Sequence, residues 1–127
     1  MSLWYSPPTM DRKEVVRWLL IVGLAYVFLF FGIEKMVRPV LWIGWIPPGF
    51  EGVFGLARNR WLLLFGVIEI ALGLLLLVPK ANIQRVVASL MAFHLFAVMT
   101  QTGVFTDIGA RDTGLLFGSV ALVFLLW

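Results

Sequence analysis

Glu69 is the residue whose position in the sequence points most directly to chemistry. It lies near the middle of residues 61–78, a run that is otherwise apolar and long enough to cross a membrane as a helix. A carboxylate at that depth is costly, and ionisable residues there usually face a bundle interior or a water-filled cavity. We therefore expect Glu69 to lie inside the protein and to mark its functional site.

His94 is the only histidine, and it lies in the next apolar run, residues 83–99. The start of residues 61–78 and the end of residues 83–99 lie on the same side of the membrane. Measured from that side, the depths of Glu69 and His94 differ by roughly 3 Å at a rise of 1.5 Å per residue. The short turn between the runs makes them antiparallel neighbours. A carboxylate and an imidazole at one depth could share a proton, so we predict Glu69 and His94 as a catalytic proton relay.

Further polar and aromatic residues fall in the same half of the membrane as this pair. Glu34 ends the first apolar segment, Gln101 ends the third, and Arg111 opens the fourth. Trp42 and Trp45 lie in the connection at that side and could supply aromatic walls. We predict these five residues as ligand-binding residues around the relay.

A simpler reading of the same residues stays open. His94 could be an interhelical hydrogen-bond partner, and Glu69 could be paired with His94 or Arg111 only to hold a bundle together. Charged residues at the helix ends, such as Lys35 and Asp112, could be interfacial anchors or a single ion-pair cluster. The convergence of several polar groups in one half of the membrane is what favours a site.

Four apolar runs predict an all-α membrane protein, a four-transmembrane-helix bundle. We expect the helices at residues 15–35, 61–78, 83–101 and 112–127, all within one domain that covers 1–127. Their lengths approach the roughly 20 residues that cross a hydrocarbon core of about 30 Å, and they lack the alternation of barrel strands. The tryptophans fall near the ends of the runs or between them, as in an interfacial belt: Trp4, Trp18, Trp42, Trp45, Trp61 and Trp127.

The first connection, Glu34 to Arg60, is long and unusually apolar. Residues 40–50 are too few to span a membrane, and Pro47-Pro48 prevents a continuous helix. We expect a partly membrane-associated segment that covers the polar end of the bundle. A surface loop that only anchors the protein is the alternative.

Short sequence signals predict the ends of helices and their packing. Thr9 or Asp11 could cap the first helix, and Asn82 is the expected N-cap of the third. Gly114 and Gly118 form a G-x-x-x-G pattern that we expect to serve internal helix packing.

Composition excludes several kinds of chemistry. The chain has no cysteine, so disulfides, thiol relays, iron–sulfur clusters and cysteine-ligated zinc are excluded within it. One histidine offers at most one strong haem ligand, so we predict no metal site and no cofactor held by the chain alone. The net charge of +3 comes from basic residues scattered near helix ends, which indicates contact with a lipid bilayer and not with nucleic acid.

The ten Lys and Arg residues do not settle the orientation by themselves. The four predicted spans place both termini on one side, and basic residues divide equally between the two sides. Because the first helix often sets the orientation, we predict cytoplasmic termini.

Three motifs, in this order, resemble DoxX-like membrane proteins of the DoxX/DoxD type. Residues 28–39 resemble the close of the family's first helix, and Gly66-x-x-Glu69-x-x-x-Gly73 resembles its second. Residues 107–114 resemble the opening of its fourth, so the resemblance covers nearly the whole chain. The family is similar to the membrane subunit of archaeal thiosulfate:quinone oxidoreductase. The resemblance therefore implies a prokaryotic cell membrane and a redox or quinone setting.

Two functions of different classes follow as expectations. The first is a quinone-interacting subunit of a membrane oxidoreductase complex, which would receive electrons from other membrane or redox subunits. The second is a non-catalytic structural or assembly subunit of a larger membrane complex. A small proton-coupled transporter is disfavoured, because four helices without a repeat make a thin pathway.

Overall fold

The computed structural model describes residues 11–127. Four long helices dominate it: α1 (Arg12–Val37), α2 (Arg58–Leu76), α3 (Ala81–Thr102) and α4 (Asp107–Leu126). Each is long and apolar enough to cross a membrane, and no strand occurs in the described part of the chain. The predicted all-α, four-helix membrane fold is confirmed.

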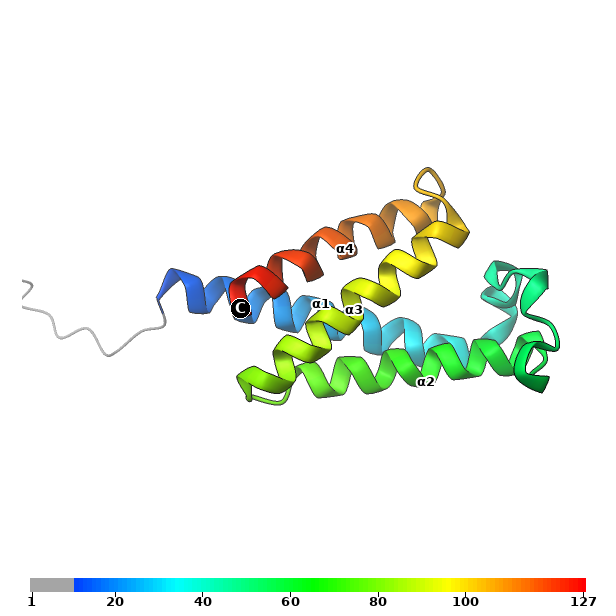
Figure 1. The fold of residues 1–127 in the computed structure, drawn as a ribbon, viewed down its shortest axis with the longest axis horizontal. Helices are drawn as coiled ribbons and strands as arrows, with labels where there is room; N and C mark the ends of the chain where they lie inside the picture. Colours follow the sequence, from blue (N-terminus) through cyan, green and yellow to red (C-terminus); the bar gives the residue numbers. More distant parts are fainter. Residues whose placement is uncertain (1–10) are drawn as a thin grey trace, which may run out of the picture.

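The helices form two closely packed pairs (Figure 1). α1 packs most extensively against α2 and α3 against α4, whereas the contacts of α2 with α3 and of α1 with α4 are smaller. The first connection and the α3–α4 turn lie at one end of the bundle, and the C-terminus and the α2–α3 turn lie at the other (Figure 1). The loosely joined α2 and α3 therefore leave room between the pairs at the connection end.

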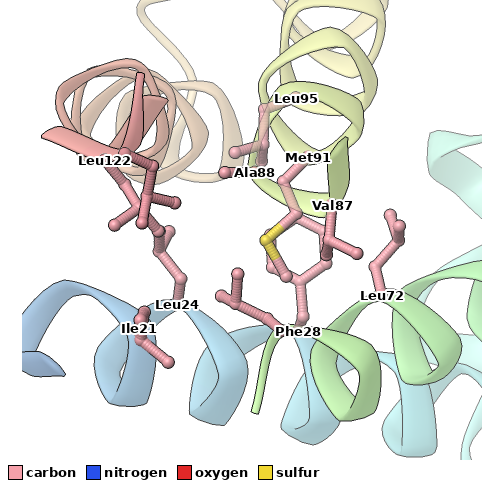
Figure 2. Packing of buried hydrophobic residues seen from close by; sticks show 11 residues of the cluster. Ile21, Leu24, Phe28, Leu72, Val87, Ala88, Met91, Leu95 and Leu122 are labelled. Carbon is pink, nitrogen blue, oxygen red and sulfur yellow. The ribbon is translucent and has the colours of Figure 1, made fainter. Parts of the chain in front are cut away.

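The apolar core joins all four helices in the middle of the bundle. Phe28 of α1, Met91 of α3 and Leu122 of α4 are all buried there, with Leu72 of α2 beside them (Figure 2). Many large apolar side chains face outward, as expected of helices that contact lipid. Few polar side chains are buried among the described residues, so those that are buried point to the functional site.

Close contact between α1 and α2 depends on glycine. A Cβ atom added at Gly32 would lie 2.8 Å from the carbonyl oxygen of Gly66, and one at Gly66 would lie 3.0 Å from that of Gly32. Gly73, two helical turns after Gly66 on α2, allows a similar close contact with Leu29 of α1. Small residues at these positions let the two backbones approach each other.

The G-x-x-x-G pattern of α4 gives a mixed result. A Cβ atom added at Gly118 would lie 4.0 Å from the side chain of Leu20 of α1, but one added at Gly114 would meet open space, and Gly114 is exposed. The prediction of internal packing is therefore wrong for Gly114, because its side of α4 faces away from the other helices.

The observed helix ends revise several predicted bounds. Asp11 caps α1 by accepting a hydrogen bond from the backbone N–H of Glu14 at 2.8 Å, as predicted, while Thr9 and Trp4 lie outside the described residues. Asn82 is not an N-cap: α3 begins at Ala81, and the Asn82 side chain accepts a hydrogen bond from Arg85 instead.

The fourth helix begins earlier than the predicted residue 112. Thr106 caps it at Asp107, and its hydroxyl accepts a hydrogen bond from the N–H of Gly109 at 2.9 Å. The same hydroxyl donates to the carbonyl of Thr102 at 3.0 Å, which ties the start of α4 to the end of α3. Arg111 thus lies in the second turn of α4, directed into the bundle.

The first connection folds back over the end of the bundle as four short 3-10 turns. These are η1 (Pro39–Leu41), η2 (Ile43–Trp45), η3 (Pro48–Phe50) and η4 (Val53–Gly55). Trp42 and Ile46 are buried, in contact with Leu62 of α2 in a second apolar cluster. Arg58 holds the segment down by donating to the carbonyl oxygens of Ile43 and Ile46.

Candidate functional site

A cavity of about 270 Å³ lies under this connection, between the two helix pairs. That volume is just below the roughly 300–1,000 Å³ typical of small-molecule sites. All four helices contribute to its walls. Its aromatic lining consists of Phe28, Phe31, Trp42, Trp45, Phe50, Trp61 and Phe65, and its charged or ionisable lining consists of Lys35, Glu69, His94, Arg111 and Asp112.

Glu69 is buried at the floor of this cavity between a lysine and the histidine. Its Oε1 lies 2.7 Å from Nζ of Lys35, and its Oε2 accepts a hydrogen bond from the same ammonium at 3.0 Å. Nε2 of His94 lies 3.6 Å from Oε1 of Glu69. The predicted proximity of Glu69 and His94 is confirmed, and a third ionisable group, Lys35, joins them.

The geometry of antiparallel helices explains why Lys35 reaches Glu69. Side chains on an α-helix lean towards its N-terminus. Lys35, near the end of α1, therefore leans down into the bundle, whereas Glu69 on the antiparallel α2 leans up towards the connection. The close approach at Gly32 and Gly66 brings the two helices near enough for their side chains to meet.

Aromatic rings fix the position of His94. The ring of Phe28 lies 6.0 Å from the imidazole between centroids, and the ring of Phe65 lies 6.3 Å from it on another side. These contacts restrict the imidazole to a position where one nitrogen faces Glu69. The histidine can then act on a group in the cavity without losing its orientation.

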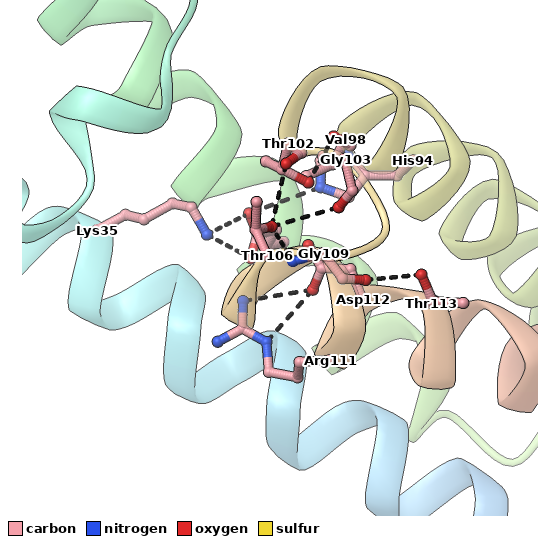
Figure 3. Close-up of polar contacts among 11 residues, drawn as sticks. Lys35, His94, Val98, Thr102, Gly103, Thr106, Gly109, Arg111, Asp112 and Thr113 are labelled. Atoms are coloured by element: carbon pink, nitrogen blue, oxygen red, sulfur yellow. Dashed lines mark hydrogen bonds and ion pairs between the residues drawn. The ribbon is translucent and has the colours of Figure 1, made fainter.

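Arg111 and Asp112 form a second charged pair on the α4 side. The guanidinium donates to Oδ1 of Asp112 at 3.3 Å, and the aspartate is buried. The guanidinium carbon lies 3.9 Å from the centre of the Phe31 ring, a cation–π arrangement. In Figure 3, Lys35 and Arg111 extend into the same polar cluster from α1 and α4.

Trp42 links the connection to these charges. Its Nε1 donates to Oε1 of Glu34 at 3.2 Å, and its ring lies 4.3 Å from Nζ of Lys35 and 5.5 Å from the guanidinium carbon of Arg111. The ring also packs edge-on against Phe31 at 5.3 Å. Trp42 thus joins the connection to the charged residues of the cavity, in addition to the hydrogen bonds that Arg58 makes with it.

The predicted ligand-binding residues occupy different positions around the cavity. Trp42, Trp45, Gln101 and Arg111 line it, with Gln101 and Trp45 at its exposed rim. Glu34 is not among the lining residues. Its carboxylate accepts a hydrogen bond from Trp42 and so supports the wall from behind. Glu34 therefore does not occupy the position for direct ligand contact that we predicted.

Sequence reasoning did not include Lys35 and Asp112 among the site residues and expected them to be interfacial anchors or part of a single ion-pair cluster. The sequence did contain a signal for Lys35. Lys35 follows Gly32 by one helical turn, so the two residues share the face of the helix that packs closely against its neighbour. For Asp112 the signal was obscured by the predicted start of the fourth helix, which the structure moves back to Asp107.

The charges lining the cavity balance. Lys35 and Arg111 offset Glu69 and Asp112, and His94 adds a group that can be neutral or charged. Within residues 11–127, no three His, Cys, Asp or Glu side chains come together as a metal site would require. The arrangement suits a neutral ligand with an apolar body and a few hydrogen-bonding atoms, next to groups that can exchange protons.

Fold and site together define a multi-pass, four-helix membrane protein with a mostly apolar cavity that holds a cluster of charged groups beneath an aromatic cover. Comparisons of the chain with models of protein families, with curated proteins and with solved structures find no match. The function must therefore be argued from the cavity.

Proposed function

We propose that this protein is a small, DoxX-like, quinone-interacting subunit of a membrane oxidoreductase complex in a prokaryotic cell membrane, with cytoplasmic termini. The observation that carries the proposal is the composition of the cavity. Aromatic rings form its walls, and the Lys35–Glu69–His94 cluster lies at its floor. A quinone ring needs flat apolar walls and hydrogen-bond donors for its two oxygens.

The charged residues have separate roles in this proposal. The ammonium of Lys35 and the guanidinium of Arg111 are donors that can bond to ring oxygens. Glu69 and His94 are the groups that can pass protons, since one can accept what the other releases. Reduction of a quinone to a quinol consumes two electrons and two protons. The electrons would come from a partner oxidoreductase subunit and the protons would pass through this cluster.

The location of the cavity also fits a lipid-soluble substrate. It lies within the apolar part of the bundle, close to the helix ends that meet the first connection. A quinone dissolved in the bilayer could reach that depth without leaving lipid. Protons could reach the same depth from the nearby surface past the exposed Gln101.

A non-catalytic structural or assembly role is the second candidate, and one observation favours it. Gly114 is exposed on α4 beside open space, which would let a helix of another subunit approach closely. In that case the buried charges would serve only to hold the four helices together.

Purification in mild detergent, followed by mass spectrometry of bound lipids and co-eluting proteins, tests the proposal. We expect a quinone to be retained by the wild-type protein and to be lost when the cavity is filled by Val98→Trp. A stable complex with partner proteins that contains no quinone, and does not respond to added quinone, would support the structural role instead.

A further inference from the structure

Asp112 is a buried carboxylate in the cavity wall that has no part in the proton route described above. It lies in the second turn of α4 and is only 5% exposed. Its Oδ1 accepts hydrogen bonds from Nε and Nη2 of Arg111, both at 3.3 Å (Figure 3). Its Oδ2 makes no hydrogen bond with any residue in 11–127. Because buried polar atoms are normally paired, we expect Oδ2 to bond to a ligand in the cavity.

Glu69 differs from Asp112 in this respect. Both oxygens of Glu69 contact the ammonium of Lys35, at 2.7 and 3.0 Å, and Oε1 also faces His94. Within the described part of the chain, no hydrogen bond or ion pair joins these three residues to the Arg111–Asp112 pair. The cavity therefore contains two separate pairs of a carboxylate and a cation, one from α1 and α2 and the other from α4.

Arg111 is held in place beside Asp112 by aromatic rings. Its guanidinium carbon lies 3.9 Å from the centre of the Phe31 ring and 5.5 Å from that of the Trp42 ring. Its positive charge offsets the negative charge that remains on Asp112 after the carboxyl group has donated a proton. The Arg111 side chain is 32% exposed, so this pair lies close enough to the surface for water to return the proton.

Two separate carboxylates match the geometry of a quinone ring. A para-quinone carries its two oxygens at opposite ends of the ring, and each oxygen gains one proton on reduction. We propose that Asp112 is a second proton donor, which protonates one ring oxygen while the Glu69–His94 pair protonates the other. This inference rests on the proposed function and divides its two protons between two carboxylates.

The transfer at Asp112 balances in protons and electrons. The O–H bond of the protonated carboxyl group breaks, and an O–H bond forms on the ring oxygen that faces it. One electron from the redox centre of the partner oxidoreductase subunit accompanies each of the two protons, so the quinone becomes a quinol. The carboxylate of Asp112 stays paired with Arg111 until it regains a proton from water at the connection end.

The test uses the purified protein, a para-benzoquinone with a short side chain and dithionite as the electron donor. The quinone is kept below the protein concentration so that it is bound. Its binding is followed by quenching of tryptophan fluorescence, since Trp42, Trp45 and Trp61 line the cavity. Stopped-flow absorbance then follows its reduction, and electron paramagnetic resonance of frozen samples detects the semiquinone radical.

The variants separate proton donation from packing. Asp112→Asn removes the proton, Asp112→Glu retains a carboxyl group, and Asp107→Asn is the control at an exposed carboxylate of the same helix. We expect Asp112→Asn still to bind the oxidised quinone, because Lys35 and Arg111 remain as donors. Reduction of the bound quinone should slow at least about tenfold and semiquinone should accumulate, because only one ring oxygen receives its proton. Asp112→Glu should restore much of the rate, and Asp107→Asn should behave as wild type.

Each contrary result has a defined meaning. Reduction at the wild-type rate without semiquinone in Asp112→Asn overturns the inference while the proposed function stands. Loss of quinone binding in a folded Asp112→Asn protein also overturns it, since Asp112 would then serve binding. If Asp112→Asn does not fold, Arg111→Gln combined with Asp112→Asn removes both charges and takes its place, with the same slow reduction expected. A wild-type protein that binds no quinone overturns both the inference and the proposed function.

Discussion

Nζ of Lys35 lies 2.7 Å from Oε1 of Glu69, and both side chains are almost completely withdrawn from the surface. This pair joins the end of α1 to the middle of α2, and it is the central electrostatic contact of the site. A buried pair is a weak source of net stability, but removing one partner leaves an uncompensated charge.

The first prediction concerns this pair. Lys35→Met should lower the free energy of unfolding by about 3–5 kcal/mol, because Glu69 then remains buried without its nearest cation. Adding Glu69→Gln should recover most of the loss, since a neutral amide is less costly to bury. Unfolding by SDS titration in mixed micelles measures both variants. Lys13→Met, at an exposed lysine near the start of α1, is the control and should change little.

The second prediction separates proton transfer from bundle stability. Glu69→Gln leaves the ammonium of Lys35 without its carboxylate, so it should lower the melting temperature while still allowing assembly, and quinone-linked electron flow per assembled complex should fall by at least about tenfold. The amide keeps the size and one acceptor oxygen of the carboxylate but cannot exchange a proton. Asp107→Asn, at an exposed carboxylate on the same side of the bundle, should leave turnover unchanged. Full turnover in a well-folded Glu69→Gln protein would favour the structural role.

The third prediction concerns the contact of α1 with α2. Gly32→Ala should destabilise the protein by about 1–3 kcal/mol, because the added Cβ meets the backbone of Gly66 and the side chain of Ile70 at 2.8 Å. Gly23→Ala on the same helix meets nothing within 4 Å and should instead stabilise by about 0.5–1 kcal/mol. Equal effects of the two substitutions in SDS titrations would show that the close approach is not needed.

The fourth prediction concerns the cover of the cavity. Arg58→Met removes the guanidinium that donates to the carbonyl oxygens of Ile43 and Ile46. Hydrogen bonds to a charged donor are worth about 1.5–3 kcal/mol, so amide hydrogen exchange in the connection should accelerate roughly ten- to hundredfold. Exchange at Trp45 and Ile46, whose N–H groups bond within the connection, reports the change by mass spectrometry.

Arg60→Met is the matched control for this experiment. Arg60 is exposed and near in sequence, and its side chain makes no hydrogen bond or ion pair with another described residue. It should leave exchange in the connection unchanged. Acceleration of the same size in both variants would show that charge at this end of α2, and not the bonds of Arg58, orders the connection.

The sequence alone determined the fold class and the presence of a polar site. Four apolar runs of membrane-spanning length allow only helices, because backbone groups in lipid must be satisfied within the segment. The cost of a carboxylate at the midpoint of one run identified Glu69, and the short α2–α3 turn placed His94 at its depth. These conclusions depend only on the hydrophobic pattern and length of each run and on the length of the turn, and all of these can be read directly from the sequence.

Only the tertiary structure decided which charged groups meet Glu69. The partnership with Lys35 depends on how far α1 slides along α2, and that register is set by the contact between Gly32 and Gly66. The burial of Asp112 depends on the capping of α4 by Thr106, and the place of Trp42 depends on the connection folding back over the bundle. Register and long-range packing arise from contacts between distant segments, so the sequence pattern of any one helix does not contain them.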